Sequence, residues 1–283
     1  MRDENMQTIH LSPQKDQVEQ FIQACREGPS TARQTLFTSL LALDGDEPAD
    51  LIDNGMLPWD APWEEIQIIW QRLAKLEIGS RIRETLMSLC HDYPAPSQDL
   101  FVRLFPMAEN DRFGRERLGG VSAWVNWEGN TMHFIVYPSP DTFRTLKSTV
   151  VHEYHHHYRI AITNNKSGHI NLLESLVREG MAEHLVQAVL GPRALAPWAT
   201  SLSEQEAWQW WNKVYSQHVD EKGSQAATYI FGGKDAGIPL WAGYSVGYYL
   251  IKWYRHTHPE ITIPELTALD GPEFIPLSRP EHL

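Results

Sequence analysis

Apolar residues recur at helical spacing along most of the chain, and this pattern predicts a largely helical protein. In the first hundred residues, the apolar stretches are separated by breaks that contain Pro or Gly, residues that end helices. We expect no strand in this part of the chain. The expected helices span residues 15–26, 31–43, 63–76, 80–91 and 97–104.

A β-hairpin is predicted in the middle of the chain. Two runs rich in aromatic and β-branched residues, 121–127 and 131–137, are joined by Glu128-Gly129-Asn130, whose Gly and Asn tolerate positive φ. Before the hairpin, a charged stretch interrupts the helical pattern and is the candidate boundary between two lobes. We therefore expect a helical N-terminal lobe over residues 1–110 and a second domain over residues 111–283.

Two long helices are predicted after the hairpin. From residue 143 to residue 162 the apolar positions occupy more than one side of a helix, which is typical of a buried central helix. The next helix, 171–190, is closed by Gly191 and Pro192, the usual order of stop residues. Further helices are expected at 203–221 and 240–256. The predicted fold class is α+β and mostly helical.

The charge balance argues against binding to nucleic acid or to a membrane surface. The chain of 283 residues has 24 basic and 36 acidic residues, a net charge of -12 that repels phosphate groups. Residues 1–18 lack the apolar run of a signal peptide, and no later run approaches the length of a membrane span. Cys25 and Cys90 are too few for a disulfide framework. We therefore expect a cytoplasmic protein.

The segment His152-Glu153-Tyr154-His155-His156 predicts a zinc site. His152 and His156 are four residues apart on the expected central helix, so their side chains share one face and can bind one cation. A catalytic zinc site uses three protein ligands and leaves a fourth position for water. Glu153 would lie beside that water and accept its proton, as the His-Glu-x-x-His pattern (HExxH) requires in zinc proteases.

Carboxylates in the following helix supply candidates for the remaining ligand. Glu179 and Glu183 interrupt its apolar stripe, where an unpaired carboxylate is so unfavourable that it requires a cation or a hydrogen-bond donor. We assign Glu179 as the third ligand and Glu183 as the acceptor that orients a ligand His through its remaining ring N–H. Glu174 is the competing third ligand. Gly180 would let this helix approach a partner closely, and we expect that partner to be the helix of His152.

With these residues in place, the chain resembles the gluzincin clan of zinc metallopeptidases, in which a downstream Glu completes the site. Glu179-Gly180-Met181-Ala182-Glu183 is similar to the third-ligand helix of the aminopeptidase branch. With Trp241-Ala242-Gly243-Tyr244-Ser245-Val246-Gly247-Tyr248 added, residues 120–255 resemble the bacterial family of predicted zinc-dependent proteases that includes YjaZ. This resemblance implies a thermolysin-like (zincin) core over 111–283, with a small antiparallel sheet before the active-site helix.

The resemblance also implies a Tyr or His that donates a hydrogen bond to the oxyanion of the tetrahedral intermediate. Tyr244, Tyr248 and His218 are the candidates, and the two tyrosines, four residues apart on one helical face, are preferred, Tyr244 first. The chain departs from the resemblance in two respects. The spacer between His156 and Glu179 is longer than in the best-known gluzincins, and the Gly-rich exopeptidase motif of the aminopeptidases is absent.

These features together predict a zinc-dependent hydrolase with one Zn²⁺ per chain, specifically a peptidase in which Glu153 is the general base for zinc-activated water. The implied substrate is a peptide or protein, held along a sheet edge near 121–137. Two alternatives stay open. One is a catalytically inactive, zinc-stabilised regulatory or protein-interaction module, and the other is a helical scaffold that binds no metal.

Overall fold

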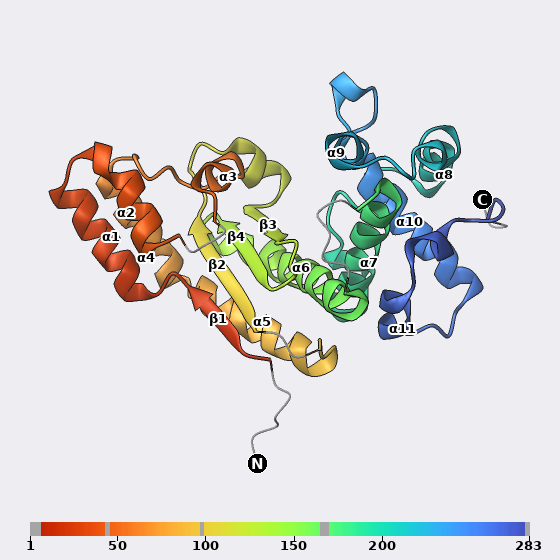
Figure 1. Cartoon of the computed structure of the whole chain (residues 1–283), viewed down its shortest axis with the longest axis horizontal. Coiled ribbons are helices and arrows are strands. Elements are labelled where there is room, and N and C mark those ends of the chain that lie inside the picture. Colours follow the sequence, from red (N-terminus) through yellow and green to blue (C-terminus); the bar gives the residue numbers. More distant parts are fainter. Residues whose placement is uncertain (1–6, 43–45, 97–98, 165–169, 281–283) are drawn as a thin grey trace, which may run out of the picture. The chain divides into compact units, whose positions relative to one another are not determined.

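The computed structural model describes residues 7–42, 46–96, 99–164 and 170–280. The chain forms two compact units, the first ending at Glu153 and the second beginning at Tyr154, and Figure 1 shows their elements. Helices dominate both units, as expected. No helix of the described residues is long and apolar enough to cross a bilayer.

The first unit contains a mixed four-stranded sheet in the order β1-β2-β4-β3. β1 (Ile9–Ser12) and β4 (Thr131–Val136) both pair with β2 (Leu100–Pro106) in parallel, and β3 (Val121–Val125) pairs with β4 in antiparallel. The β3–β4 pair confirms the predicted hairpin. The expectation of an antiparallel sheet is wrong, because three of the four strands run the same way. β1 and β3 are the edges of this sheet (Figure 1).

The turn of the hairpin is stabilised by side-chain capping of the backbone. The Asn126 side-chain oxygen accepts hydrogen bonds from the N–H groups of Asn130 and Thr131, each at 3.0 Å. Gly129 has a φ of 76°, which a residue with a side chain rarely adopts. The turn residues that predicted the hairpin therefore form it.

β2 replaces the helix predicted at 97–104, of which residues 97 and 98 lie outside the described part of the chain. The strand is almost entirely buried, so its apolar run has no alternation that would distinguish it from a buried helix. Arg103 interrupts the run and is 1% exposed, because it forms an ion pair with Asp46 and donates to the carbonyl of Leu41 at 2.7 Å. His133 on β4 contacts the same carboxylate at 2.8 Å.

Between β1 and β2, the described residues form five helices. Four correspond to predicted helices, and one short helix, α3, was not predicted. The boundary expected near residue 110 falls between β2 and β4, which pair in one sheet, and the compact units divide elsewhere, inside α6. The helices are α1 (Lys15–Glu27), α2 (Arg33–Leu40), α3 (Pro48–Asp53), α4 (Trp63–Lys75) and α5 (Ile78–Asp92).

The second unit is built around two packed helices, α7 (Leu172–Leu190) and α10 (Ala242–Thr257). α7 begins where the Asn171 side chain accepts a hydrogen bond from the N–H of Glu174, and it ends at Gly191, whose φ is 83°. The predicted bounds and the predicted stop at Gly191 are confirmed, and the structure adds the Asn171 cap as the start signal. α6 (Phe143–Thr163) leads into this unit, which is completed by α8 (Glu204–Lys213), α9 (Gly223–Phe231) and α11 (Ile263–Ala268).

Candidate metal centre

α6 carries both histidines of the predicted site. The helix follows a short 3-10 turn, in which the Ser139 side chain accepts a hydrogen bond from the N–H of Asp141, and it runs without a break to Thr163. His152 and His156 are one turn apart, so the helix places both imidazoles on one face. His152 is 5% exposed, and the His156 side chain is 13% exposed.

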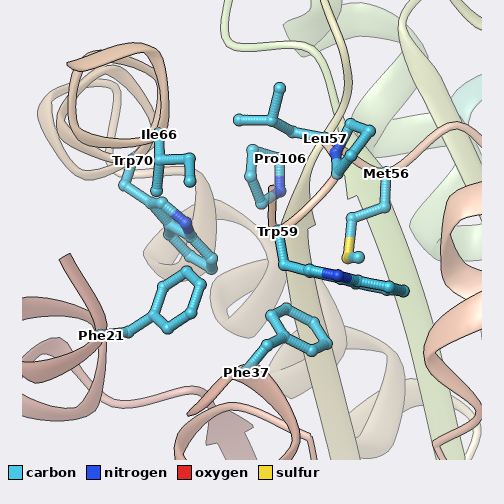
Figure 2. A pocket seen from close by; sticks show the side chains of 9 residues that line it. Phe21, Phe37, Met56, Leu57, Trp59, Ile66, Trp70 and Pro106 are labelled. Atoms are coloured by element: carbon cyan, nitrogen blue, oxygen red, sulfur yellow. The ribbon is translucent and has the colours of Figure 1, made fainter. Parts of the chain in front are cut away.

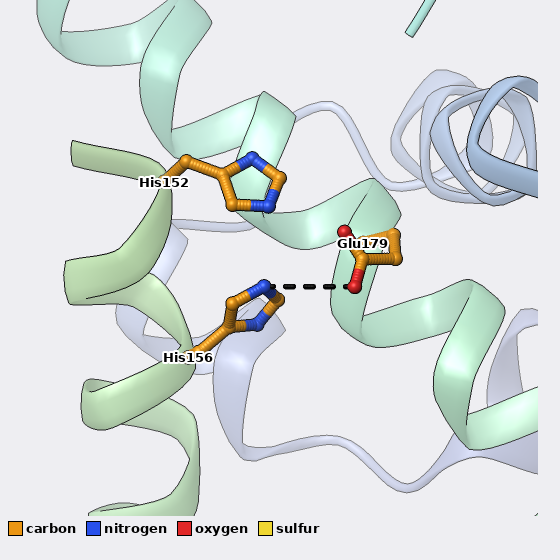
Figure 3. A group of neighbouring side chains, drawn as sticks. All are labelled: His152, His156 and Glu179. Carbon is orange, nitrogen blue, oxygen red and sulfur yellow. Dashed lines mark ion pairs between the residues drawn. The ribbon is translucent and has the colours of Figure 1, made fainter. Parts of the chain in front are cut away.

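α7 supplies the third member of the group, Glu179. One ligand atom from each of His152, His156 and Glu179 lies within 4.8 Å of the other two. Nε2 of His156 is 3.6 Å from Oε1 of Glu179. The dashed line in Figure 3 marks this ion pair. Within the described ranges, no other group of three or more His, Cys, Asp or Glu side chains meets this spacing.

The donor set and its spacing fit a zinc ion. Zinc binds imidazole nitrogen and carboxylate oxygen at about 2.0–2.2 Å, so two ligand atoms of a tetrahedral ion lie about 3.3–3.6 Å apart. The 3.6 Å between His156 and Glu179 matches this separation. Two imidazoles and one carboxylate are also a ligand set of catalytic zinc sites, which keep a fourth position open.

Glu174, the alternative candidate for the third zinc ligand, forms ion pairs with two arginines. Its two carboxylate oxygens accept hydrogen bonds from Nε and Nη2 of Arg159, each at 2.9 Å. Arg178 donates to the same carboxylate at 3.2 Å. Burial lowers the pKa of Arg178, and the charge of Glu174 opposes that shift. Glu174 is therefore an ion-pair partner, and it is not a member of the three-residue group.

Glu183, one turn beyond Glu179 on α7, is 1% exposed. Its carboxylate accepts hydrogen bonds from the backbone N–H of Ala196 and from the indole N–H of Trp198, both at 3.1 Å. We expected a carboxylate in this apolar stripe to need a cation or a hydrogen-bond donor. The N–H groups of Ala196 and Trp198 are such donors, and the sequence did not identify them. The predicted role of Glu183, to orient a ligand His, stays a prediction.

Gly180 permits a close helix crossing, but not with the partner that we expected. A Cβ atom at Gly180 would lie 2.1 Å from the carbonyl oxygen of Gly247, and one at Gly247 would lie 2.1 Å from that of Leu176. These contacts join α7 to α10, so the expected partner, the helix of His152, is wrong. The two glycines let the backbones of α7 and α10 touch directly beside Glu179.

We predict that Gly180→Ala destabilises the fold by about 1–3 kcal/mol, because the added methyl group meets rigid backbone and forces α7 away from α10. Urea unfolding of the metal-free protein measures this loss. Gly79→Ala in α5 is the matched control, since its methyl group would clash only with the end of the Leu11 side chain, which can move. Equal stability of the two variants would contradict the close crossing.

The three candidates for oxyanion donor lie in different surroundings. Tyr248 is 7% exposed, donates its hydroxyl hydrogen to Gln187 at 3.0 Å and stacks on His184. Burial, and secondarily the charge of Glu183, raise the pKa of Tyr248. The phenol of Tyr248 is thus held in the core of the second unit.

Tyr244 is only partly buried, and its ring centroid lies 6.2 Å from that of Trp198. Trp198 in turn donates to Glu183 of α7, so Tyr244 is connected to the helix of Glu179. His218 instead stacks on Tyr229 at 4.7 Å. His218 does not belong to the metal-ligand group found among the described residues.

The other histidines of the α6 segment are buried structural residues. His155 is 1% exposed and hydrogen-bonded through Nε2 to Oγ1 of Thr267 at 3.2 Å. The Thr267 hydroxyl donates its hydrogen to the carbonyl of Ile263, so His155 must be the donor to Thr267. His157 is fully buried, with its ring 5.6 Å from that of Tyr154.

The chain is similar to known bacterial proteins. Residues 78–276, more than half of the chain, match the family described as "Predicted Zn-dependent protease (DUF2268)". Uncharacterized protein YjfC of Bacillus subtilis (strain 168) is 31% identical over 166 residues, which are 56% of this chain and 52% of YjfC. Uncharacterized protein YjaZ of the same organism is 27% identical over 179 residues, 61% of this chain and 67% of YjaZ.

The alignment with YjfC thus spans about half of that protein's length. No solved structure matches the chain. The family match extends from α5 to the residues just after α11 and includes both helices of the metal-ligand group. The chain therefore belongs to the DUF2268 family of predicted zinc-dependent proteases.

Proposed function

We propose that this protein is a zinc-dependent peptidase of the gluzincin type, with His152, His156 and Glu179 as ligands of one zinc ion. One observation carries the proposal: two imidazoles and a carboxylate from α6 and α7 converge with ligand atoms within 4.8 Å of one another. Membership of a family of predicted zinc-dependent proteases supports the same interpretation. A thermolysin-like core is part of this proposal.

The proposed reaction is hydrolysis of a peptide bond. A zinc ion bound to this group would polarise the scissile carbonyl and lower the pKa of a neighbouring water to about 7. Glu153 takes the proton of the attacking water and passes it to the leaving amine. Glu153 follows His152 directly and is 5% exposed, so its carboxylate is shielded from bulk water.

Two further residues have supporting roles in the proposal. Glu183 accepts the remaining ring N–H of a ligand His and so fixes the direction of its imidazole. Tyr244 donates its phenol hydrogen to the oxyanion, a contribution of about 3–4 kcal/mol where such donors have been removed from other enzymes. We prefer Tyr244 to Tyr248 because the hydroxyl of Tyr248 already donates to Gln187.

The proposed substrate is a peptide segment in extended conformation. β3 is an edge of the sheet, and most of its residues are partly exposed. An edge strand offers backbone N–H and C=O groups to a substrate strand, which gives affinity without requiring a particular side chain. We propose that a peptide or protein substrate pairs along the hairpin at 121–137.

Metal content and peptide hydrolysis test the proposal together. Protein purified without a His-affinity tag and supplied with zinc is expected to hold one zinc per chain and to cleave unstructured peptides, as detected by mass spectrometry. A chelator should abolish cleavage, and added zinc should restore it. Less than about a tenth of a zinc per chain would contradict the metal site. Full zinc without cleavage would favour the zinc-stabilised interaction module.

A further inference from the structure

Arg159 is a buried cation on α6 that the proposed reaction does not use. Its side chain is 2% exposed, and it forms a bidentate ion pair with Glu174 in the first turn of α7, with both bonds at 2.9 Å. Bidentate pairs of this kind are strong and fix the relative direction of the two groups. The pair therefore joins α6 to α7 at a defined angle.

The opposite side of the same guanidinium holds the end of α11. Nη1 of Arg159 donates to the carbonyl oxygens of Thr267, at 2.7 Å, and of Leu269, at 3.1 Å. The last carbonyls of a helix have no partner inside the helix, so a cation there is favourable. His155, four residues earlier on α6, reaches Oγ1 of Thr267. α6 is thus held on one side by α7 and on another by α11.

Arg159 and the metal-ligand group form two cross-links between the same pair of helices. His152, His156 and Arg159 are spaced by four and three residues, which places them on one face of α6. Along the helix axis Arg159 is about 4.5 Å from His156, and along α7 Glu174 is about 7.5 Å from Glu179. One contact would let the helices slide or pivot, whereas two separated contacts fix their register.

We propose that Arg159 is a positioning residue of the metal centre: its ion pair with Glu174 sets the register in which His156 and Glu179 meet. This inference rests on the proposed zinc site. Stability alone explains the pair poorly, because a buried ion pair is often replaced by packed apolar side chains without loss. Two packed apolar side chains would not fix the relative orientation of α6 and α7 as the bidentate ion pair does.

Arg159→Met tests the inference through zinc affinity. We expect chelator competition to show affinity about 10–100-fold weaker than wild type, the range typical when a residue that orients a ligand is removed. The absorption spectrum of the Co²⁺-substituted protein should also change, since it reports ligand geometry directly. Lys252→Met is the control, because it removes another cross-helix ion pair of the same unit, the pair between Lys252 of α10 and Glu204 of α8.

The double variant Arg159→Met/Glu174→Met separates positioning from folding. Because Glu174 also pairs with Arg178, the double variant removes one of the two cations that lose this carboxylate in Glu174→Met. We expect its metal-free form to be more stable than that of Glu174→Met while its zinc affinity stays low. A double variant that regains both stability and wild-type zinc affinity would overturn the positioning role. So would an Arg159→Met variant that binds zinc as tightly as Lys252→Met. A wild-type chain that binds no zinc would instead overturn the proposed site itself.

Discussion

Glu153→Gln is expected to retain one zinc per chain and to lower kcat by about 10²–10⁴-fold, the usual contribution of a general base. The amide has the shape of the carboxylate but cannot accept the proton of the attacking water. Because Glu153 is not among the three ligand candidates, the metal should stay bound. Single-turnover hydrolysis of a peptide found to be cleaved by the wild type, with zinc measured on the same sample, gives both quantities.

The pattern of the two readouts identifies what Glu153 does. Loss of zinc in Glu153→Gln would indicate that its carboxylate is a ligand, contrary to the assignment. Turnover within a factor of about ten of wild type would show that another group takes the proton. A circular dichroism spectrum equal to that of wild type is the control for folding, since Glu153 is buried in α6.

Glu179→Ala is expected to weaken zinc binding by more than about 100-fold, because even residues that only orient a ligand contribute 10–100-fold. The substitution removes the carboxylate and leaves two imidazoles on α6, one fewer than the three protein ligands of a catalytic zinc site. Chelator competition on the purified variant measures the affinity. Hydrolysis should fall with zinc occupancy and recover only at high zinc concentration.

Glu221→Ala is a matched control for this substitution. Glu221 lies 3.5 Å from Nδ1 of His218, nearly the distance between Glu179 and His156, but the pair belongs to no three-ligand group of the described residues. We expect Glu221→Ala to bind zinc as wild type does. If the two alanine variants lose the same amount of zinc, or neither loses any, Glu179 is not a ligand.

The helices and turns whose ends are set by neighbouring residues in the sequence were predicted well. α7 has its Asn171 cap and its Gly191 stop, and the hairpin has Gly129 in its turn, so their bounds agree with the prediction to within a few residues. α11 was missed, although Thr262 and Glu265 form a capping box at its start. That signal could have been found, but a helix of six residues is too short for an apolar period to be recognised.

The elements that depend on distant partners were predicted poorly. β2 is buried by strands from both earlier and later in the chain, and Arg103 finds Asp46 across 57 residues. Neither the strand pairing of β2 nor the Arg103–Asp46 ion pair produces a pattern of apolar and polar residues around position 103. Gly180 signalled a close helix crossing, but a glycine does not specify which helix approaches it. The partner was α10, 67 positions away at Gly247.

The candidate site depends both on local sequence signals and on contacts between distant residues. The spacing of His152 and His156 is local, and Glu179 was selected because a carboxylate in an apolar stripe needs a partner. The structure brings those three together. Two supporting contacts were not predicted: the hydrogen bond from the Trp198 indole to Glu183 and the hydrogen bond from the Arg159 guanidinium to Glu174. Both depend on tertiary packing, which the sequence pattern does not show.

The most direct test of the metal centre is an anomalous difference map from zinc-loaded crystals, recorded at the zinc absorption edge. We predict one peak per chain, at about 2.0–2.2 Å from a nitrogen of His152, a nitrogen of His156 and an oxygen of Glu179. A peak bound to other residues, or no peak in protein that contains zinc in solution, would contradict the assignment.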